Sequence, residues 1–467
     1  MKELTKGSPT KVIMLFAIPI IIGNLLQLTY SLIDTRIVGE YLGEEALAAV
    51  GATASLSSLV IGFLNGIGNG FAVIVARYFG AGEKRGIQRA VAGSLSLAIG
   101  IAVFLTLLTL VLLHPILVLL NTPKEIMDLS YQYIFIIFAG MLISMLYNVS
   151  AAILRAVGDT LTPLIFLGLS TILNIFGDIF CIRILHLGVR GAAFATVASQ
   201  FLAMAACMLY MFRRYDILRF PMHDFLFRLR PWPAKSVKKR SKYEKRANTN
   251  LRLILDLLSC GLSMGFMGCL VNIGSVALQS GINSLGDELI TAHMAARKLT
   301  ELYMVMFSVF GSTMATYSGQ NYGAGKYDRI HTGMWKALQI TWAWCVIVLI
   351  CSYTPICPML IKAVTASQNP VIIDNAVLYL KVNTVLYFVA ATICVLRNVM
   401  QGTGDHVTPI VSSFIECIGK IVIVIVLVPP LGYMGIIVSE PIVWILMVIP
   451  LLIQIRVKNA TMKKQAE

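Results

Sequence analysis

The sequence predicts an all-α membrane protein, on three observations: few charges, long uncharged apolar runs and an internal repeat. Of 467 residues, 57% are hydrophobic and only 13% are charged, against about 25% charged in a typical soluble domain. The runs 12–33, 91–120, 134–153 and 337–361 contain no Asp, Glu, Lys or Arg. Crossing a hydrocarbon core takes about 20 helical residues, and the alternation of barrel strands is missing. We therefore expect membrane-spanning helices.

Breaks between the apolar runs predict twelve spans, at roughly 11–39, 46–77, 90–114, 129–154, 161–186, 191–212, 253–283, 289–318, 333–355, 374–400, 407–429 and 433–455. The first run is too long for the core of a cleaved signal peptide, so we expect it to remain as a helix. Loops rich in Lys and Arg alternate with loops that are not. Because basic loops stay in the cytoplasm, we expect a multi-pass protein of the cell membrane with both termini cytoplasmic.

The net charge of +15 is concentrated in one place. Twelve Lys or Arg and three acids lie between residues 213 and 246. A basic stretch between membrane helices is typical of a cytoplasmic loop, and it could contact anionic lipid, so we do not expect nucleic-acid binding. The domains predicted are an amino-terminal six-helix lobe (1–212), a basic cytoplasmic linker (213–249) and a carboxyl-terminal six-helix lobe (250–467).

An internal repeat is the most informative feature of the sequence. Four landmarks recur in order at offsets of 243, 243, 246 and 244 residues: Leu42-Gly43 with Leu285-Gly286, Gly80-Ala81-Gly82 with Gly323-Ala324-Gly325, Gly158-Asp159 with Gly404-Asp405, and Leu187-Gly188 with Leu431-Gly432. Six spans per half is an even number, so both halves enter the membrane in the same direction. Parallel repeats of this kind occur in secondary transporters, with the substrate site between the repeats.

Polar residues present in one half only are the candidates for function, because residues that merely build the fold should recur. Asn174 and Asp178 lie four apart on one helix face, and the amino-terminal half adds a carboxylate and a hydroxyl. The candidate site is Asp34, Asn174, Asp178 and Thr196, whose counterparts are Ala277, Lys420, Val424 and Glu440. Carboxylate, amide and hydroxyl oxygens suit hard cations, so Na⁺ or H⁺ could bind there. The alternative for Asp34 is a solvated position near the outer interface.

The carboxyl-terminal half offers a second polar set, formed by Asn272, Asn383, Glu416, Lys420 and Glu440. Glu416 and Lys420 are spaced i, i+4 and could form a self-neutralising ion pair. The alternative is substrate contact or a second titrating site. Glu440 precedes Pro441 and has no cation near it in sequence. Asn272 could equally hold helices together.

No catalytic or ATP-binding motif appears. The sequence contains no phosphate-binding loop, and its nine cysteines and six histidines show no metal-ligand spacing. We therefore expect a transporter and not an enzyme, without a cofactor, driven by an ion gradient or by a partner.

The sequence resembles the multidrug and toxic compound extrusion (MATE) family. The resemblance rests on the order and spacing of several short stretches, which are Pro19 with Leu32-Ile-Asp34-Thr35, Ala76-Arg77-Tyr78-Phe79-Gly80-Ala81-Gly82, Arg155-Ala-Val-Gly158-Asp159, Asn174-Ile-Phe-Gly-Asp178 and Gln320-Asn321-Tyr322-Gly323-Ala324-Gly325. It implies twelve helices in two lobes that form a V. In members with an amino-lobe ion site, the ion-binding positions match Asp34, Asn174, Asp178 and Thr196. Other members use two carboxylates in helices seven and ten, where this sequence offers Asn272 and Asn383.

The resemblance implies antiport of organic cations or drugs in exchange for Na⁺ or H⁺. We expect an amphipathic or cationic small-molecule substrate and a monomeric protein. The alternative is a flippase for lipid-linked saccharides from the same superfamily. An anionic pyrophosphate substrate would require several cations in the cavity, whereas the main mid-span cations in the sequence are Lys381 and Lys420.

Overall fold

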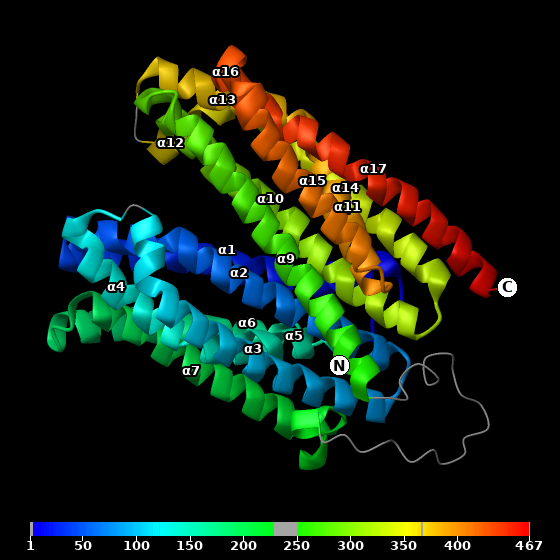
Figure 1. Cartoon of the computed structure of the whole chain (residues 1–467). Helices are drawn as coiled ribbons and strands as arrows, with labels where there is room; N and C mark the ends of the chain where they lie inside the picture. Colours follow the sequence, from blue (N-terminus) through cyan, green and yellow to red (C-terminus); the bar gives the residue numbers. More distant parts are fainter. Residues whose placement is uncertain (1–2, 121, 228–249, 366–367, 467) are drawn as a thin grey trace, which may run out of the picture. The chain divides into compact units, whose positions relative to one another are not determined.

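The computed structural model describes residues 3–120, 122–227, 250–365 and 368–466, and within these ranges the chain is almost entirely helical and contains no strand (Figure 1). Nine of the described helices are long and apolar enough to cross a membrane, or eleven when each of two bent helix pairs counts as one span. The predicted all-α membrane fold is therefore confirmed.

The amino-terminal helices follow the predicted spans closely. Their bounds are α1 Pro9–Leu42, α2 Glu44–Gly80, α3 Lys84–Leu119, α4 Lys124–Ala139, α5 Met141–Ala156, α6 Leu161–Ile179 and α7 Gly188–Arg214. A short π-helix, η1 Phe180–Ile184, continues α6, and two 3₁₀ turns, η2 Asp216–Leu218 and η3 Met222–Phe227, follow α7. The rest of the predicted linker, 228–249, lies outside the described residues.

The carboxyl-terminal helices repeat this order. Their bounds are α9 Asn250–Asn283, α10 Asp287–Gly323, α11 Tyr327–Tyr353, α12 Ile356–Thr365, α13 Pro370–Val385, α14 Tyr387–Gly402, α15 Val407–Val426, α16 Val428–Leu431 and α17 Tyr433–Ala466. The predicted span 289–318 lies in α10, which is not among the helices that qualify as spans by composition. It carries Arg297, Lys298 and Glu301 in its first half. The helix is in place, but it is polar.

The four sequence landmarks of the repeat are turns that need glycine. One glycine of each landmark has a positive φ in both halves, and the equivalent glycines are Gly43 with Gly286, Gly82 with Gly325, Gly158 with Gly404, and Gly188 with Gly432. A residue with a side chain is strained in this conformation. The repeat is therefore visible in the sequence because both halves end or begin their helices with the same backbone geometry.

Two bends also repeat, without a shared residue. The pair α4–α5 bends by 46° at Gly140, and the pair α13–α14 bends by 54° at Leu386, 246 residues later. At Gly140 a Cβ would lie 2.6 Å from Val197 Cγ2, so only glycine fits. A leucine makes the same bend in the second half. We predicted single uninterrupted spans here, because one residue cannot signal a bend that packing imposes.

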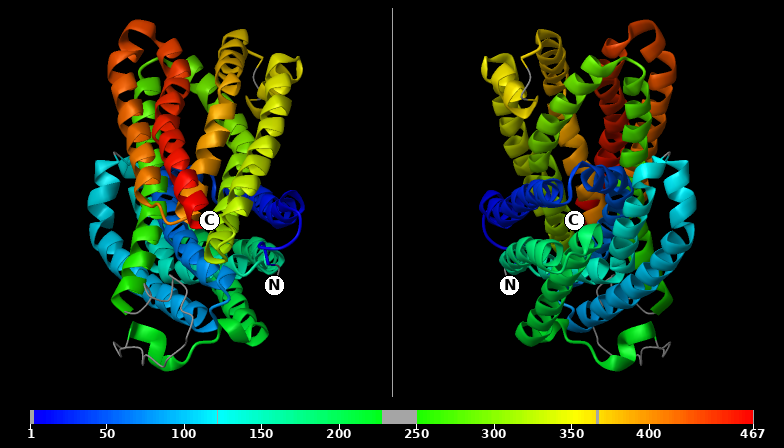
Figure 2. Two further views of the ribbon diagram at one scale, coloured as in Figure 1. Left: turned by 90° about the vertical axis from the view of Figure 1, so that its right-hand side faces the viewer. Right: turned by 90° about the vertical axis from the view of Figure 1, so that its left-hand side faces the viewer.

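The helices pack into two compact units. We call them the N-unit, mainly Ile18–Gly265, and the C-unit, Leu4–Ala17 with Phe266–Glu467. In the N-unit, α2 packs on α3, α4 and α5, and α7 packs on α4, α5 and α6. In the C-unit, α10 packs on α11, α13 and α14, while α15 and α17 run side by side (Figure 2). These boundaries fall inside α1 and α9, whereas the domain division from the sequence stays a prediction.

The first residues of the C-unit are fastened to the turn between α10 and α11. Gln320 Oε1 accepts from the Leu4 backbone at 2.9 Å, and Lys326 Nζ donates to the Thr5 carbonyl at 2.9 Å. Arg329 donates to the carbonyls of Leu4 and Gly7 at 3.2 and 2.9 Å. Leu4 is buried. We refer to this segment, residues 4–7, as the amino-terminal clasp.

Candidate functional site

The structure brings the four predicted cation-coupling residues together inside the N-unit. Asp34 lies late in α1, Asn174 and Asp178 lie on the buried face of α6, and Thr196 lies in α7. In the amide orientation that satisfies its neighbours, Asn174 Nδ2 donates to Asp178 Oδ2 at 3.0 Å, and its oxygen accepts from the Thr196 backbone at 3.1 Å. The same amide donates to the Tyr30 hydroxyl at 3.0 Å. The i, i+4 spacing on α6 therefore aims both side chains at α1 and α7.

The two carboxyl groups of this site lie within hydrogen-bonding reach of each other. In addition, Asp34 Oδ1 and Asp178 Oδ1 are buried and have no hydrogen-bond partner among the described residues. Two adjacent carboxylates repel each other, and a buried oxygen without a partner is costly. A proton or a cation between them would remove both penalties. Two carboxylates, an amide and a hydroxyl are also a donor set that fits a hard cation.

A cavity of about 630 Å³, including its open mouth, shares Asn174 and Thr196 with this site. No residue that lines it carries a formal charge. The amide side chains in its wall are Gln27, Asn65, Asn148, Asn174 and Gln200, and the hydroxyls include those of Tyr30, Tyr147, Ser144, Ser170, Thr171, Thr196 and Ser199. The N-unit therefore places a hydrogen-bonding cavity against a pair of carboxyl groups.

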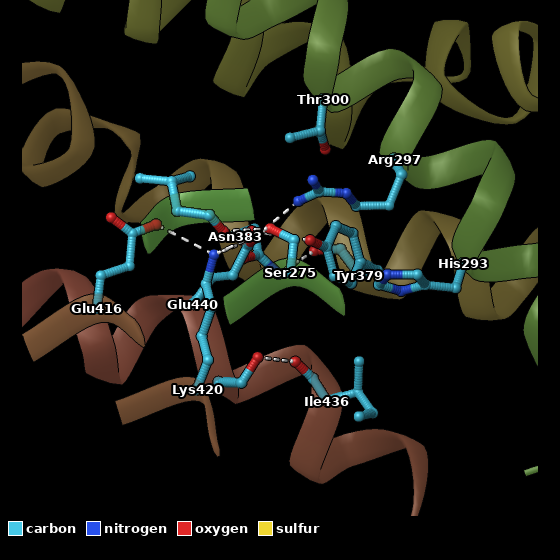
Figure 3. Close-up of polar contacts among 12 residues, drawn as sticks. Ser275, His293, Arg297, Thr300, Tyr379, Asn383, Glu416, Lys420, Ile436 and Glu440 are labelled. Carbon is cyan, nitrogen blue, oxygen red and sulfur yellow. Dashed lines mark hydrogen bonds and ion pairs between the residues drawn. The ribbon is translucent and has the colours of Figure 1, made fainter. Parts of the chain in front are cut away.

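In the C-unit, three of the five predicted polar residues meet in one buried charge cluster (Figure 3). Lys420 Nζ lies 3.1 Å from Glu416 and 3.7 Å from Glu440. The predicted Glu416–Lys420 ion pair thus forms, but it is part of a larger network. Contrary to the isolation of Glu440 in the sequence, Arg297 Nη1 lies 2.7 Å from its carboxylate, and Tyr379 donates a hydrogen bond to it at 2.9 Å.

The two asparagines of the predicted carboxyl-terminal site differ in placement. Asn383 is buried beside the cluster and donates to the carbonyls of Tyr379 and Ile437 at 3.0 and 3.1 Å, while its Oδ1 has no partner among the described residues. Asn272 is half-buried on α9 and shows no hydrogen bond to the described part of the cluster. The structure therefore does not unite the full predicted set.

Two internal arginines, the half-buried Arg297 and the buried Arg397, were not among the predicted site residues. Arg297 contacts Glu440, and Arg397 Nη2 lies 3.5 Å from Glu416, so Lys381 and Lys420 are not the main internal cations. At the offsets of 243 and 246, their counterparts are Ala54 and Ala151. Both arginines therefore lack a charged counterpart in the other half, as Asp34 does, and this difference is the sequence signal that marks them.

Long apolar helices that enclose buried charges and a polar cavity define a polytopic helical membrane protein of the transporter class. The MatE family model matches residues 19–180 and 264–429. The chain therefore belongs to the MatE family, the multidrug and toxic compound extrusion transporters that its sequence resembles.

Relatives and solved structures agree with this assignment. The chain is 28% identical over 328 residues to the probable multidrug resistance protein YpnP of Bacillus subtilis (strain 168), covering 70% of this chain and 68% of that protein. It is 25% identical over 422 residues to the probable multidrug resistance protein YoeA of the same organism, covering 88% and 85%. A MOP superfamily transporter from Pyrococcus furiosus matches at a TM-score of 0.85 with 23% identity, covering 99% of this chain and 98% of that one. At this identity the match shows the fold.

Proposed function

We propose that the protein is a secondary active antiporter that exports organic cations or drugs in exchange for Na⁺ or H⁺. The observation that carries the proposal is the Asp34–Asp178 pair, with two buried carboxylate oxygens that have no partner among the described residues. The relatives YpnP and YoeA are named for multidrug resistance, which supports drugs as the class of solute. The protein would act as a monomer in the cell membrane, with both termini in the cytoplasm.

Coupling would arise from the residues shared by the ion site and the cavity. Asn174 and Thr196 line the cavity and also bond within the carboxyl site. A proton or Na⁺ between Asp34 and Asp178 would lower by one the negative charge that attracts a cationic solute and would change the hydrogen bonds of Asn174. An ion drives transport only if it binds the outward- and inward-facing states with different affinity. The ion and the solute would therefore compete at one place.

Replacing Asp178 with Asn should abolish ion-dependent efflux while the protein still inserts, because the amide carries no charge to hold a coupling ion. Export of ethidium from proteoliposomes, driven separately by a Na⁺ gradient and by a pH gradient, measures the loss and identifies the ion. Asp128→Asn is the matched control, since Asp128 is exposed in the same unit. Unaltered export by the Asp178 variant would refute the assignment.

The flippase alternative is not favoured. The scarcity of internal cations no longer argues against it, because Arg297 and Arg397 add to Lys420. The matching family model and the names of the relatives instead favour drug export. In the same proteoliposomes, translocation of a lipid-linked saccharide without ethidium export would reverse this choice.

A further inference from the structure

The two repeats hold opposite chemistry at equivalent positions. Asn174 and Thr196 of the N-unit correspond to Lys420 and Glu440 of the C-unit, at offsets of 246 and 244. In the N-unit this place is filled by oxygen donors around two carboxyl groups. In the C-unit it is filled by charged side chains of both signs (Figure 3). The equivalent positions therefore suit a cation in the N-unit, whereas in the C-unit they belong to a cluster of cations and carboxylates.

The charged side chains of the C-unit cluster do not balance. It contains three cations, Arg297, Lys420 and Arg397, and two carboxylates, Glu416 and Glu440, and among the described residues no other carboxylate forms an ion pair with these cations. Glu301, one turn along α10 from Arg297, is exposed and pairs with Lys298 at 3.8 Å. Protonation of His293, whose ring packs on Tyr379 at 5.0 Å, would only add positive charge. The cluster therefore carries a net charge of +1, which an incoming anion would balance.

The carboxylates of the cluster are already fully engaged. Glu416 faces Arg397 and Lys420, and Glu440 faces Arg297, Lys420 and the Tyr379 hydroxyl. A cation entering this region would find no carboxylate without a positive neighbour. The cluster therefore favours an incoming anion over an incoming cation.

Arg297 is the cation that an incoming anion could reach. Its side chain is 30% exposed, against 3% for Lys420 and 7% for Arg397. Of its guanidinium nitrogens, Nη1 bonds to Glu440, and a guanidinium has five N–H donors. The remaining donors keep the fork geometry that binds carboxylate or phosphate oxygens in pairs. Thr300, one turn along α10, places a buried hydroxyl beside the same face.

We propose that Arg297 and the cluster behind it bind a carboxylate or phosphate group of the exported solute, so that Arg297 selects solutes that carry such a group. This inference rests on the proposed export function. The C-unit cluster would attract the anionic group of a solute by itself, whatever the carboxyl pair of the N-unit binds.

Two dyes that differ in one group test the proposal. Rhodamine B carries a free carboxylate, whereas in rhodamine B ethyl ester this group is blocked. Fluorescence anisotropy with the purified full-length protein in detergent measures binding, and proteoliposomes measure export. Wild-type protein should bind the acid in preference to the ester. Arg297→Gln should weaken acid binding about tenfold, the loss expected for one charged pair, and should leave ester binding unchanged.

The controls separate charge from folding and from transport. Lys298→Gln removes an exposed positive charge from the neighbouring residue and should change neither dye. Arg297→Lys keeps the charge without the fork, so it should retain part of the preference. Because binding is measured without a gradient, failure of export leaves the binding result valid and counts only against the proposed antiport. Equal wild-type binding of acid and ester overturns the inference, as does a preference that survives in Arg297→Gln. Suppression of both dyes by chloride alone would assign the cluster to an inorganic ion and also overturn it.

Discussion

At the scale of single residues, the buried charges of the C-unit depend on one another. Glu440 contacts Arg297, Lys420 and Tyr379 at once, so the loss of one of these partners leaves the carboxylate with two others. Removing Arg297 leaves two cations facing two carboxylates. Removing the charge of Glu440 leaves three cations facing one. The arithmetic of the cluster therefore predicts an asymmetry between two substitutions at the same ion pair.

Glu440→Gln should destabilise the protein by about 3–5 kcal/mol, the usual penalty for leaving a buried charge without its partner. Arg297→Gln should be milder, because Lys420 and Tyr379 still face the carboxylate. Apparent melting temperatures in detergent at one protein concentration give the comparison, and Glu301→Gln, an exposed carboxylate on α10, serves as control. Equal losses from the two substitutions would mean that the pair acts alone and not as part of a cluster.

The amino-terminal site could be predicted from the sequence, and the carboxyl-terminal cluster only in part, for a physical reason. Asp178 lies among apolar residues and Asp34 directly follows the uncharged run 12–33, so both are candidates for function inside the membrane. Arg297 lies in a polar stretch beside Lys298 and Glu301. Such a stretch equally predicts a helix face exposed to water. Which face of α10 is buried depends on packing against α13 and α14, which no local pattern contains.

At the scale of helices, glycines that carry no turn set how closely the spans approach. A Cβ on Gly402 of α14 would lie 2.8 Å from the Ala315 carbonyl and 2.7 Å from Ser318 Cβ, both in α10. Backbone atoms cannot give way as a flexible side chain can. By contrast, a Cβ on Gly100 of α3 would meet nothing within 4 Å. Close helix packing therefore requires glycine at position 402, whereas position 100 has room for a side chain.

Gly402→Ala should destabilise the C-unit by about 1–3 kcal/mol, because it overpacks a helix contact. Gly100→Ala should be neutral or stabilising by about 0.5–1 kcal/mol, because alanine is the better helix former. Thermal unfolding in detergent distinguishes them. If both substitutions shift the midpoint by the same amount, α10 and α14 do not pack as closely as described.

At the scale of the whole molecule, the repeat turns recur with matching geometry, but the residues between them are free to differ. The positive-φ glycines pair across the halves, and so do the bends at Gly140 and Leu386. The turns can be recognised in the sequence because each contains a glycine in both halves. The bends cannot, because glycine stands at the bend in one half and leucine at the equivalent position in the other. Parallel repeats then place equivalent turns on the same side of the membrane.

Cysteines introduced at equivalent turns should report this orientation. Lys84→Cys and Asp328→Cys, near the Gly82 and Gly325 turns, should react with an impermeant maleimide from one side, and Glu45→Cys and Asp287→Cys from the other. All four sites are exposed, whereas the native cysteines are buried or half-buried. Right-side-out and inside-out vesicles give the comparison. Opposite labelling of the Lys84 and Asp328 positions would indicate inverted repeats.

The amino-terminal clasp bears on how the protein is made. Its hydrogen bonds join residues 4–7 to residues 320–329, more than 300 positions later. During synthesis, residues 4–7 therefore remain without these partners until α10 and the turn after it have been made. The clasp can close only from that point on, after the helices of the N-unit and α9 have already left the ribosome.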